Sequence, residues 1–178
     1  LCDRITGRGD SQEILETLER GNMLIFPLDD ERQWYRYHHL FADVLLAHAT
    51  QELPDQIANW QKRASQWYAE NGFKVEAVHY AFVAQDYERT ADLLELGWPA
   101  IFNGFQPIQW RGWVESLPDE MVRRRPVLST GYAWTLLDDG IVDGVEARLQ
   151  DAEHWLDKQD SADGPIVVNQ REFASLPA

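Results

Sequence analysis

Cysteine and basic residues are scarce in this chain, and each shortage excludes some classes of protein or partner. The 178 residues include one cysteine, Cys2, so an internal disulfide framework is excluded and a reducing compartment, the cytoplasm, is expected. Lysine and arginine number 16 against 30 aspartates and glutamates, which gives a net charge of −14. A chain this acidic repels nucleic acid and anionic membranes, so neither is expected as a direct partner.

Long hydrophobic runs and catalytic motifs are also missing. The sequence has no run of eighteen apolar residues that could span a bilayer. It has no phosphate-binding G-x-x-x-x-G-K-S/T loop, no His-Glu-x-x-His and no Gly-x-Ser-x-Gly. The carboxylates fall mostly on solvent-facing helix positions, so the chain is predicted not to be an enzyme. It opens on Leu-Cys-Asp-Arg, with neither an initiator methionine nor a signal peptide, and we expect a segment of a longer protein.

Helical periodicity dominates what the sequence does contain. Hydrophobic residues make up 44% of the chain, enough for the core of one or two domains. From Leu40 onward, apolar residues recur every three or four positions and glycines or prolines punctuate the pattern, which is typical of short antiparallel helices. The spacing predicts helices over residues 11–20, 40–51, 55–71, 75–85, 87–96, 108–117, 119–125, 126–137 and 142–156, and it leaves open whether a helix continues over 98–102 after Pro99.

One β-hairpin is predicted near the start, over about residues 23–38. Met23–Leu28 favours an extended strand, and Pro27 places that strand at an edge. Asp29–Arg32 is predicted to turn, and Trp34–His38 to form the return strand, because aromatic residues pack well on a pleated surface. A helix, a hairpin and a helix are the outline of a winged-helix module without its first helices.

The ends of two helices show recognisable capping patterns. Asp10 followed by Glu13 predicts a capping box at the start of the helix over 11–20, and Gly21-Asn22 predicts a left-handed end. Asp55 is predicted to cap the helix that follows Pro54.

The second part of the chain shows a loose internal repeat. Glycines at expected helix ends fall at Gly72, Gly104 and Gly140, and the outer two are 68 residues apart, twice the length of a tetratricopeptide unit. We therefore predict a mainly α protein with three parts: a winged-helix-like module over 1–52, a tetratricopeptide-like helical stack over 53–160, and an irregular end over 161–178.

Two interpretations of the tryptophans remain open. Six of them lie on predicted helical faces, where tryptophan usually forms the core between stacked helices. Some could instead line a groove and contact a sugar or peptide ligand through a flat apolar ring and one N–H donor. The six are Trp60, Trp67, Trp110, Trp113, Trp134 and Trp155.

His38 and His39 are the most suggestive polar pair, because they stand where the predicted strand passes into a helix. A helix N-terminus exposes N–H donors and can meet a phosphate. The alternative is that one ring is buried and hydrogen-bonded while the other faces solvent. A metal site is not predicted, because adjacent strand side chains point to opposite faces. Arg123–Arg125, the one basic cluster, is interpreted as a solvated turn.

Direct DNA binding by the winged-helix part is also not predicted. The helix that would read DNA carries Glu13, Glu16 and Glu19, and the wing turn is acidic too. Both would repel phosphates.

Five segments of the chain follow one another in a familiar order: Pro27–Asp30, Trp34–Asp43, Arg63–Gly72, Glu76–Ala81 and Asp86–Leu94. Taken in this order, they closely resemble the middle of the MalT-like, large ATP-binding LuxR-family transcriptional activators of bacteria. The resemblance covers about residues 1–157, and its specificity comes from the order and spacing of the segments.

The resemblance implies a regulatory segment between a nucleotide-binding domain and a DNA-binding domain. His38 matches a histidine that, in related ATPases, contacts the β-phosphate of bound ADP, whereas His39 stands where those proteins have aspartate. This chain itself is expected to hold no cofactor; ATP or ADP belongs to the full-length family. The implied partners are the nucleotide-binding domain and, on the helical repeats, a small-molecule inducer or regulatory protein. The alternative is a stand-alone helical-repeat adaptor.

Overall fold

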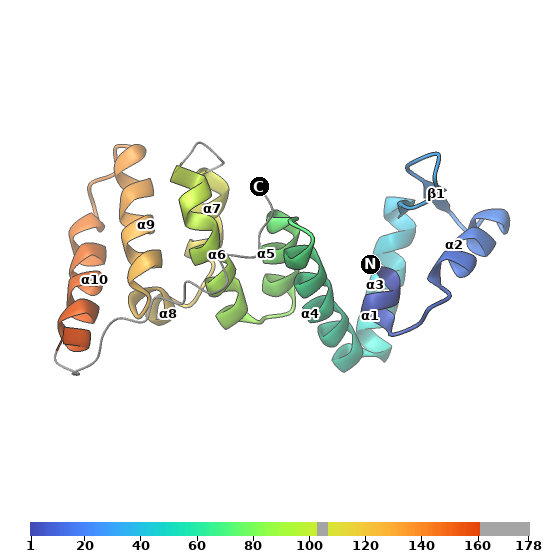
Figure 1. Cartoon of the computed structure of the whole chain (residues 1–178), viewed down its shortest axis with the longest axis horizontal. Helices are drawn as coiled ribbons and strands as arrows, with labels where there is room; N and C mark the ends of the chain where they lie inside the picture. The colour runs from blue at the N-terminus through green and yellow to red at the C-terminus, as the bar shows by residue number, and fades with distance from the viewer. Residues whose placement is uncertain (103–106, 161–178) are drawn as a thin grey trace. The chain divides into compact units, whose positions relative to one another are not determined.

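The computed structural model describes residues 1–102 and 107–160, and it divides into two compact units. The first unit is Leu1–Leu93 and the second begins at Leu94. Both are mainly helical, which confirms the predicted fold class (Figure 1). None of the helices in the described residues has the length and apolarity needed to cross a membrane.

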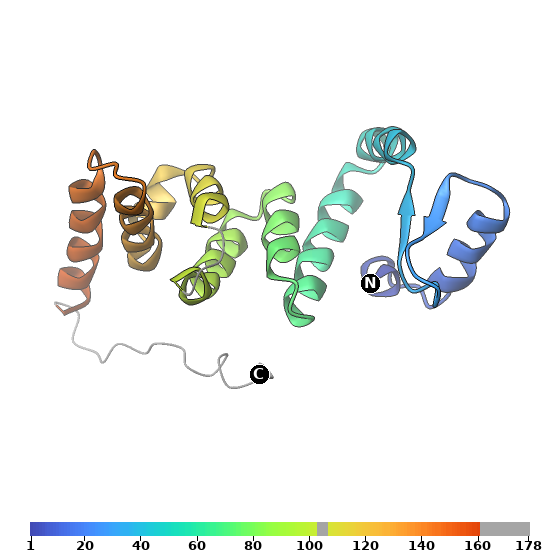
Figure 2. The same ribbon diagram turned by 90° about the horizontal axis from the view of Figure 1, so that it is seen from above.

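The first unit holds the predicted β-hairpin between helices. The two strands are antiparallel, with Ile25 opposite Tyr37 and Pro27 opposite Tyr35, and both are edge strands, as Pro27 requires (Figure 2). The elements are α1 (Cys2–Thr6), α2 (Ser11–Arg20), β1 (Ile25–Pro27), β2 (Tyr35–Tyr37), α3 (His39–Glu52), α4 (Pro54–Glu70), α5 (Lys74–Val83) and the start of α6 (Tyr87–Phe102).

The second unit is a stack of helices. It contains the end of α6, then α7 (Pro107–Glu115), α8 (Asp119–Arg123), α9 (Pro126–Asp138) and α10 (Val145–Asp160), with α9 and α10 packed together. The predicted helical stack is therefore confirmed, whereas its tetratricopeptide character and the boundary between residues 52 and 53 stay predictions. Gly104 and the predicted irregular end over 161–178 lie outside the described residues.

Small side chains let α4 and α5 approach closely in the first unit. Ala64 of α4 and Ala77 and Ala81 of α5 are buried where the two helices pack together. Ser65 is also fully buried: its hydroxyl donates to the carbonyl oxygen of Ala77 at 2.8 Å and accepts from Nε of Arg89 at 3.0 Å. This one hydroxyl therefore links α4, α5 and α6.

Trp110 is the centre of the core of the second unit. Its side chain is 2% exposed, and its indole N–H donates to the carbonyl oxygen of Leu94 at 3.0 Å. The ring of Trp98 packs against it with centroids 4.8 Å apart, and Gly131 of α9 approaches both rings. The core interpretation of the tryptophans holds for Trp110, whereas Trp134 is 53% exposed.

The predicted capping box at Asp10 is wrong. The Asp10 side chain makes no capping bond; both its oxygens accept hydrogen bonds from the Arg8 guanidinium, at 2.8 and 2.7 Å. The first amide of α2, at Ser11, instead donates to Oδ1 of Asp3 at 3.0 Å. Arg8 thus binds the Asp10 carboxylate, and the carboxylate of Asp3 in α1 accepts the hydrogen bond from α2 in its place.

The left-handed end predicted at Gly21-Asn22 is present, whereas the start of α4 differs from expectation. At the end of α2 the left-handed residue is Asn22, with φ 53°, while Gly21 has φ −76°. At the start of α4 the N-cap is Leu53, and Asp55 lies inside the first turn, because Pro54 occupies the first helical position. The acidic Asp55 still suits the positive end of the helix.

Asp119 joins α8 to α10. Its carboxylate accepts a hydrogen bond from Arg148 of α10 and another from Nε of Arg123 at 2.7 Å. Both hydrogen bonds lower the pKa of Asp119 below its usual value, and the bond from Arg148 has the larger effect.

This lowered pKa predicts a pH-dependent stability. A carboxyl whose folded pKa lies below its unfolded value of about 3.9 stabilises the fold above that pH, and the contribution is lost as pH falls through the folded pKa. Asp119→Asn should therefore lower the melting temperature by a constant amount above about pH 5 and by progressively less below about pH 4. Thermal melts across pH 3 to 7 check this, and a mutant difference that stays constant down to pH 3 would contradict it.

Candidate functional site

His38 and His39 lie at the junction between β2 and α3. His38 is the N-cap of α3: its N–H donates to the carbonyl oxygen of Leu24 at 2.8 Å, and its carbonyl oxygen accepts from the amides of Phe41 and Ala42, both at 2.9 Å. The junction predicted from the sequence is therefore present, and the hydrogen bond to Leu24, the residue just before β1, holds its backbone.

The two histidine rings are arranged differently from expectation. They stack with centroids 4.5 Å apart and an angle of 28° between planes, and both side chains are exposed. The rings do not point to opposite faces, because the strand ends at Tyr37 and His38 is already the helix cap. Neither ring is buried, whereas the alternative interpretation required one of the two rings to be buried.

The first turn of α3 suits an anion. It carries no acidic residue, and no side chain caps it. The N-terminus of a fourteen-residue helix presents N–H donors and a partial positive charge. Two exposed imidazoles beside it add further donors.

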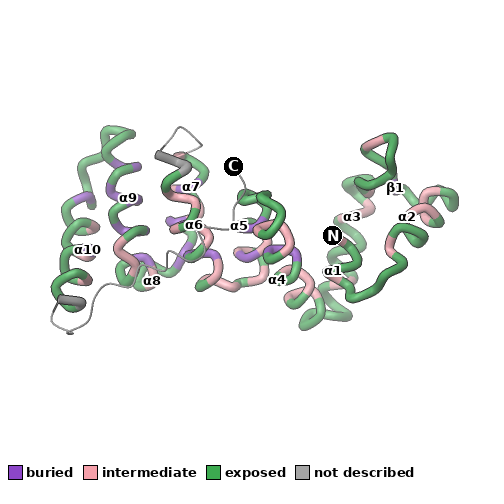
Figure 3. The backbone as a smooth tube through the Cα atoms, in the orientation of Figure 1, coloured by how far each residue is buried: buried purple, intermediate pink, exposed green. Residues whose placement is uncertain are grey.

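Helix α3 is apolar, yet none of its residues is buried (Figure 3). Leu40 is 62% exposed, Val44 64% and Leu46 55%. We call Leu40, Val44, Leu45 and Leu46 the α3 surface. An apolar patch rimmed by polar residues usually marks an interaction site. The sequence pattern predicted this helix but not its exposure.

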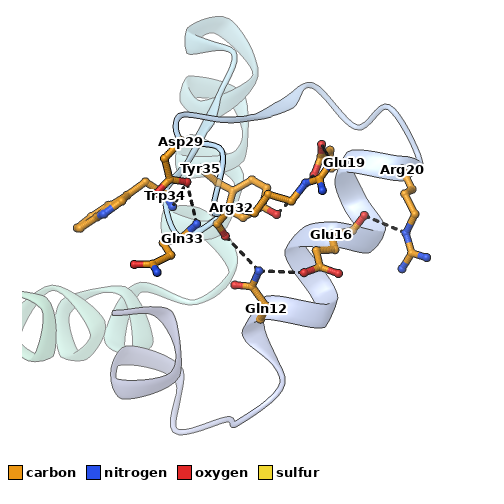
Figure 4. A network of polar contacts seen from close by, with 9 residues as sticks. All are labelled: Gln12, Glu16, Glu19, Arg20, Asp29, Arg32, Gln33, Trp34 and Tyr35. Carbon is orange, nitrogen blue, oxygen red and sulfur yellow. Dashed lines mark hydrogen bonds and ion pairs between the residues drawn. The ribbon is translucent and has the colours of Figure 1, made fainter.

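A polar network fixes the turn of the hairpin against α2 (Figure 4). The amide group of Gln12 donates to the carbonyl oxygen of Arg32 at 3.1 Å and to Glu16 at 2.9 Å. The Arg32 guanidinium pairs with Glu19 at 3.2 Å, and the Tyr35 hydroxyl reaches the same carboxylate at 3.4 Å. Two glutamates that would repel DNA thus bond within the module.

The start of β2 is held by a second part of this network. Oδ1 of Asp29 accepts hydrogen bonds from the backbone amides of Gln33, at 2.8 Å, and Trp34, at 3.2 Å (Figure 4). Arg32, which lies between Asp29 and Gln33 in the turn, has a left-handed backbone with φ 54°. The hairpin therefore presents His38 from a fixed scaffold.

A cavity of about 360 Å³ lies in the first unit, among α1, α2, the hairpin and α4. Four aromatic side chains line it: Trp34, Tyr35, Tyr37 and Trp67. Burial raises the pKa of both tyrosine hydroxyls, so they are neutral donors at physiological pH. Sequence reasoning missed this cavity, because its walls come from segments that are far apart in the chain, from Leu1 to Trp67, and only the fold brings them together.

The basic cluster Arg123–Arg125, at the end of α8 and the start of α9, makes its contacts within the second unit. Nε of Arg123 bonds to Asp119 at 2.7 Å, Nε of Arg124 donates to the carbonyl oxygen of Glu120 at 3.2 Å, and Arg125 pairs with Glu95 at 3.2 Å. The sequence predicted a solvated turn here; in the structure, all three guanidinium groups also have partners within the chain. No cluster of three or more potential metal-binding side chains occurs among residues 1–102 and 107–160.

Comparison with known proteins supports the resemblance. Residues 1–57 match the model of the MalT winged helix domain. The chain is 32% identical over 153 residues to the HTH-type transcriptional regulator MalT of Vibrio cholerae, which covers 85% of this chain and 17% of that protein. Against MalT of Serratia proteamaculans the identity is 29% over 160 residues, or 89% of this chain and 18% of that protein.

A kinase shares the same region. The serine/threonine-protein kinase PknK of Mycobacterium tuberculosis is 31% identical over 134 residues, covering 75% of this chain and 12% of that protein. No solved structure matches the chain. The chain thus spans less than a fifth of these relatives' length.

Proposed function

We propose that this MalT-like chain is a non-catalytic regulatory segment of a bacterial, cytoplasmic transcriptional regulator of the LuxR family. Its winged-helix part, residues 1–52, packs on a nucleotide-binding domain of the same protein in the resting state. Its tetratricopeptide-like part, residues 53–160, receives an inducer or a regulatory protein and biases that packing. The winged-helix match and the two relatives named as transcriptional regulators support the proposal.

The observation that carries the proposal is the α3 surface immediately after His38. Leu40 and Val44 are more than 60% exposed on a helix that begins beside two exposed imidazoles. Covering such a surface is favourable by about 25 cal/mol for each Å² of apolar area. The occupant we propose is the nucleotide-binding domain, since more than four-fifths of each MalT relative lies outside the matched segment.

In this arrangement His38 contacts the nucleotide. Its exposed ring stands at the N-terminus of α3, where an imidazole donor and the helix end both favour a phosphate oxygen of ADP. His39 stacks on it and replaces the aspartate of the family pattern, which removes a negative charge from the phosphate side. The resting state would then be held by both the nucleotide and the α3 surface.

Replacing His38 by alanine in the full-length regulator should loosen ADP. A hydrogen bond to a charged group contributes about 1.5 to 3 kcal/mol, so ADP affinity should fall roughly 10- to 100-fold and basal transcription should rise. Retention of labelled ADP after gel filtration, together with a promoter reporter, measures both effects.

The matched control is His48→Ala. His48 is also exposed and lies near the other end of α3, where it pairs with Glu52 at 3.3 Å. It should leave ADP retention unchanged. Equal retention by His38→Ala and the wild-type protein would refute the nucleotide role of His38.

The alternative function is a helical-repeat adaptor without a nucleotide-binding partner. It is favoured by the exposed side chains of Val127, Trp134 and Leu137, which are spaced for one face of α9. Pull-down with a separately produced nucleotide-binding domain discriminates the two. Binding that is lost in a Leu40→Glu variant favours the regulatory segment, and no binding favours the adaptor.

A further inference from the structure

The aromatic cavity of the first unit has a composition that selects one class of ligand. Four aromatic rings and the carboxylate of Asp3 line it, and no lysine, arginine or histidine is among the described residues that do so. Its volume of about 360 Å³ is in the range of small-molecule sites. Apart from the terminal amino group of Leu1, the one charged group among the described lining residues is the Asp3 carboxylate.

The two tryptophans provide perpendicular walls. The rings of Trp34 and Trp67 have centroids 6.5 Å apart and planes at 69°, so the edge of one meets the face of the other. Trp67 also stacks on Phe73, at 6.1 Å and 12°, which supports it from outside the cavity. Trp34 is 40% exposed, so its ring is accessible to a ligand.

The Asp3 carboxylate supplies a negative charge to the cavity lining, and acetylation of Leu1 removes the positive terminal amino group that otherwise acts on it. Oδ1 of Asp3 is held by the Ser11 amide at 3.0 Å, which keeps the carboxylate at the cavity while leaving its lone pairs partly available. Two arginines whose backbones lie nearby are already paired, Arg8 with Asp10 at 2.7 Å and Arg32 with Glu19 at 3.2 Å. Neither guanidinium therefore neutralises Asp3.

We propose that this cavity binds an organic cation, with an alkylammonium or guanidinium group held between the indole faces and the Asp3 carboxylate. A cation over aromatic faces is attracted by the ring quadrupole, and tryptophan attracts it most strongly. The Tyr37 hydroxyl and the indole N–H groups offer further polar contacts for the rest of the ligand. This site is independent of the nucleotide role of His38.

Binding of choline and of 3,3-dimethylbutan-1-ol, its uncharged isostere, to the 178-residue chain tests the proposal. Calorimetry follows binding, and the N-terminus is acetylated because Leu1 also lines the cavity. Choline should bind at least about tenfold more tightly than the isostere, because only the cation gains from the rings and the carboxylate. Equal binding of the two would overturn the proposal, since it would indicate an apolar cavity only.

Three variants locate the site. Asp3→Asn and Trp34→Leu should each weaken choline binding about tenfold, whereas Trp34→Phe, which keeps an aromatic face, should weaken it less. Trp134→Leu, an exposed tryptophan of the second unit, should have no effect. Asp3 is exposed, so its variant should stay folded even if Trp34→Leu does not. Choline binding unchanged by both Asp3→Asn and Trp34→Leu would overturn the site.

The source of the cation is distinguished by two glycine-flanked peptides, one carrying trimethyl-lysine and one carrying arginine. Tighter binding of either peptide than of choline supports a side chain of a partner protein as the ligand. Tighter binding of choline supports a free small molecule. No saturable binding by any of the three cations overturns the proposal.

Discussion

Replacing Trp110 by alanine is expected to lower the free energy of unfolding of the second unit by about 3 to 5 kcal/mol. The indole is 2% exposed, so its removal leaves a cavity that the helices around it cannot fill. It also removes the donor for the carbonyl oxygen of Leu94, 3.0 Å away, and the ring that packs on Trp98.

Urea unfolding followed by circular dichroism measures this loss. Trp134→Ala is the matched control: it truncates the same residue type where 53% of it is exposed, and should cost less than about 1 kcal/mol. Trp110→Phe should fall between them, because it keeps a ring but leaves the carbonyl oxygen without its donor. A Trp110→Ala protein as stable as Trp134→Ala would show that this core is wrongly assigned.

Local patterns were sufficient to predict most elements of the fold. The helix over 11–20 was predicted with the bounds that α2 has, and the predicted hairpin over about 23–38 contains β1 and β2. These succeed because helical spacing, aromatic alternation and turn residues act over a few positions. The helix caps were predicted less well. The Asp10 carboxylate binds Arg8, and the Ser11 amide at the start of α2 donates instead to Asp3, eight residues away.

The candidate site could be predicted only in part. The strand-to-helix junction at His38 follows from neighbouring residues, and its nucleotide role stays a prediction. The exposure of Leu40 and Val44 could not be foreseen, because an apolar helical stripe ordinarily indicates a buried face. The aromatic cavity was equally hidden: Asp3 and Trp67 meet only because α1 packs on α4.

Gly131 shows how tertiary packing reverses a local preference. In an isolated helix, alanine is more stable than glycine by about 1 kcal/mol, so Gly131→Ala in α9 would be expected to stabilise the protein. In the structure, a Cβ at this position would lie 2.7 Å from Cη2 of Trp110 and 2.9 Å from Cε3 of Trp98. The Trp110 ring is 2% exposed, so it has little room to move away from an added methyl group.

Gly131→Ala is therefore expected to destabilise the second unit, by about 1 to 3 kcal/mol, because overpacking outweighs the gain in helix propensity. Gly112 provides the opposite control: it is also inside a helix, α7, but a Cβ there meets nothing within 4 Å. Gly112→Ala should stabilise the same unit by about 0.5 to 1 kcal/mol. Urea unfolding of the two variants should thus give shifts of opposite sign. A shift to higher stability in both would mean that the two indoles yield to a methyl group and that close packing of α9 on them is not what requires glycine.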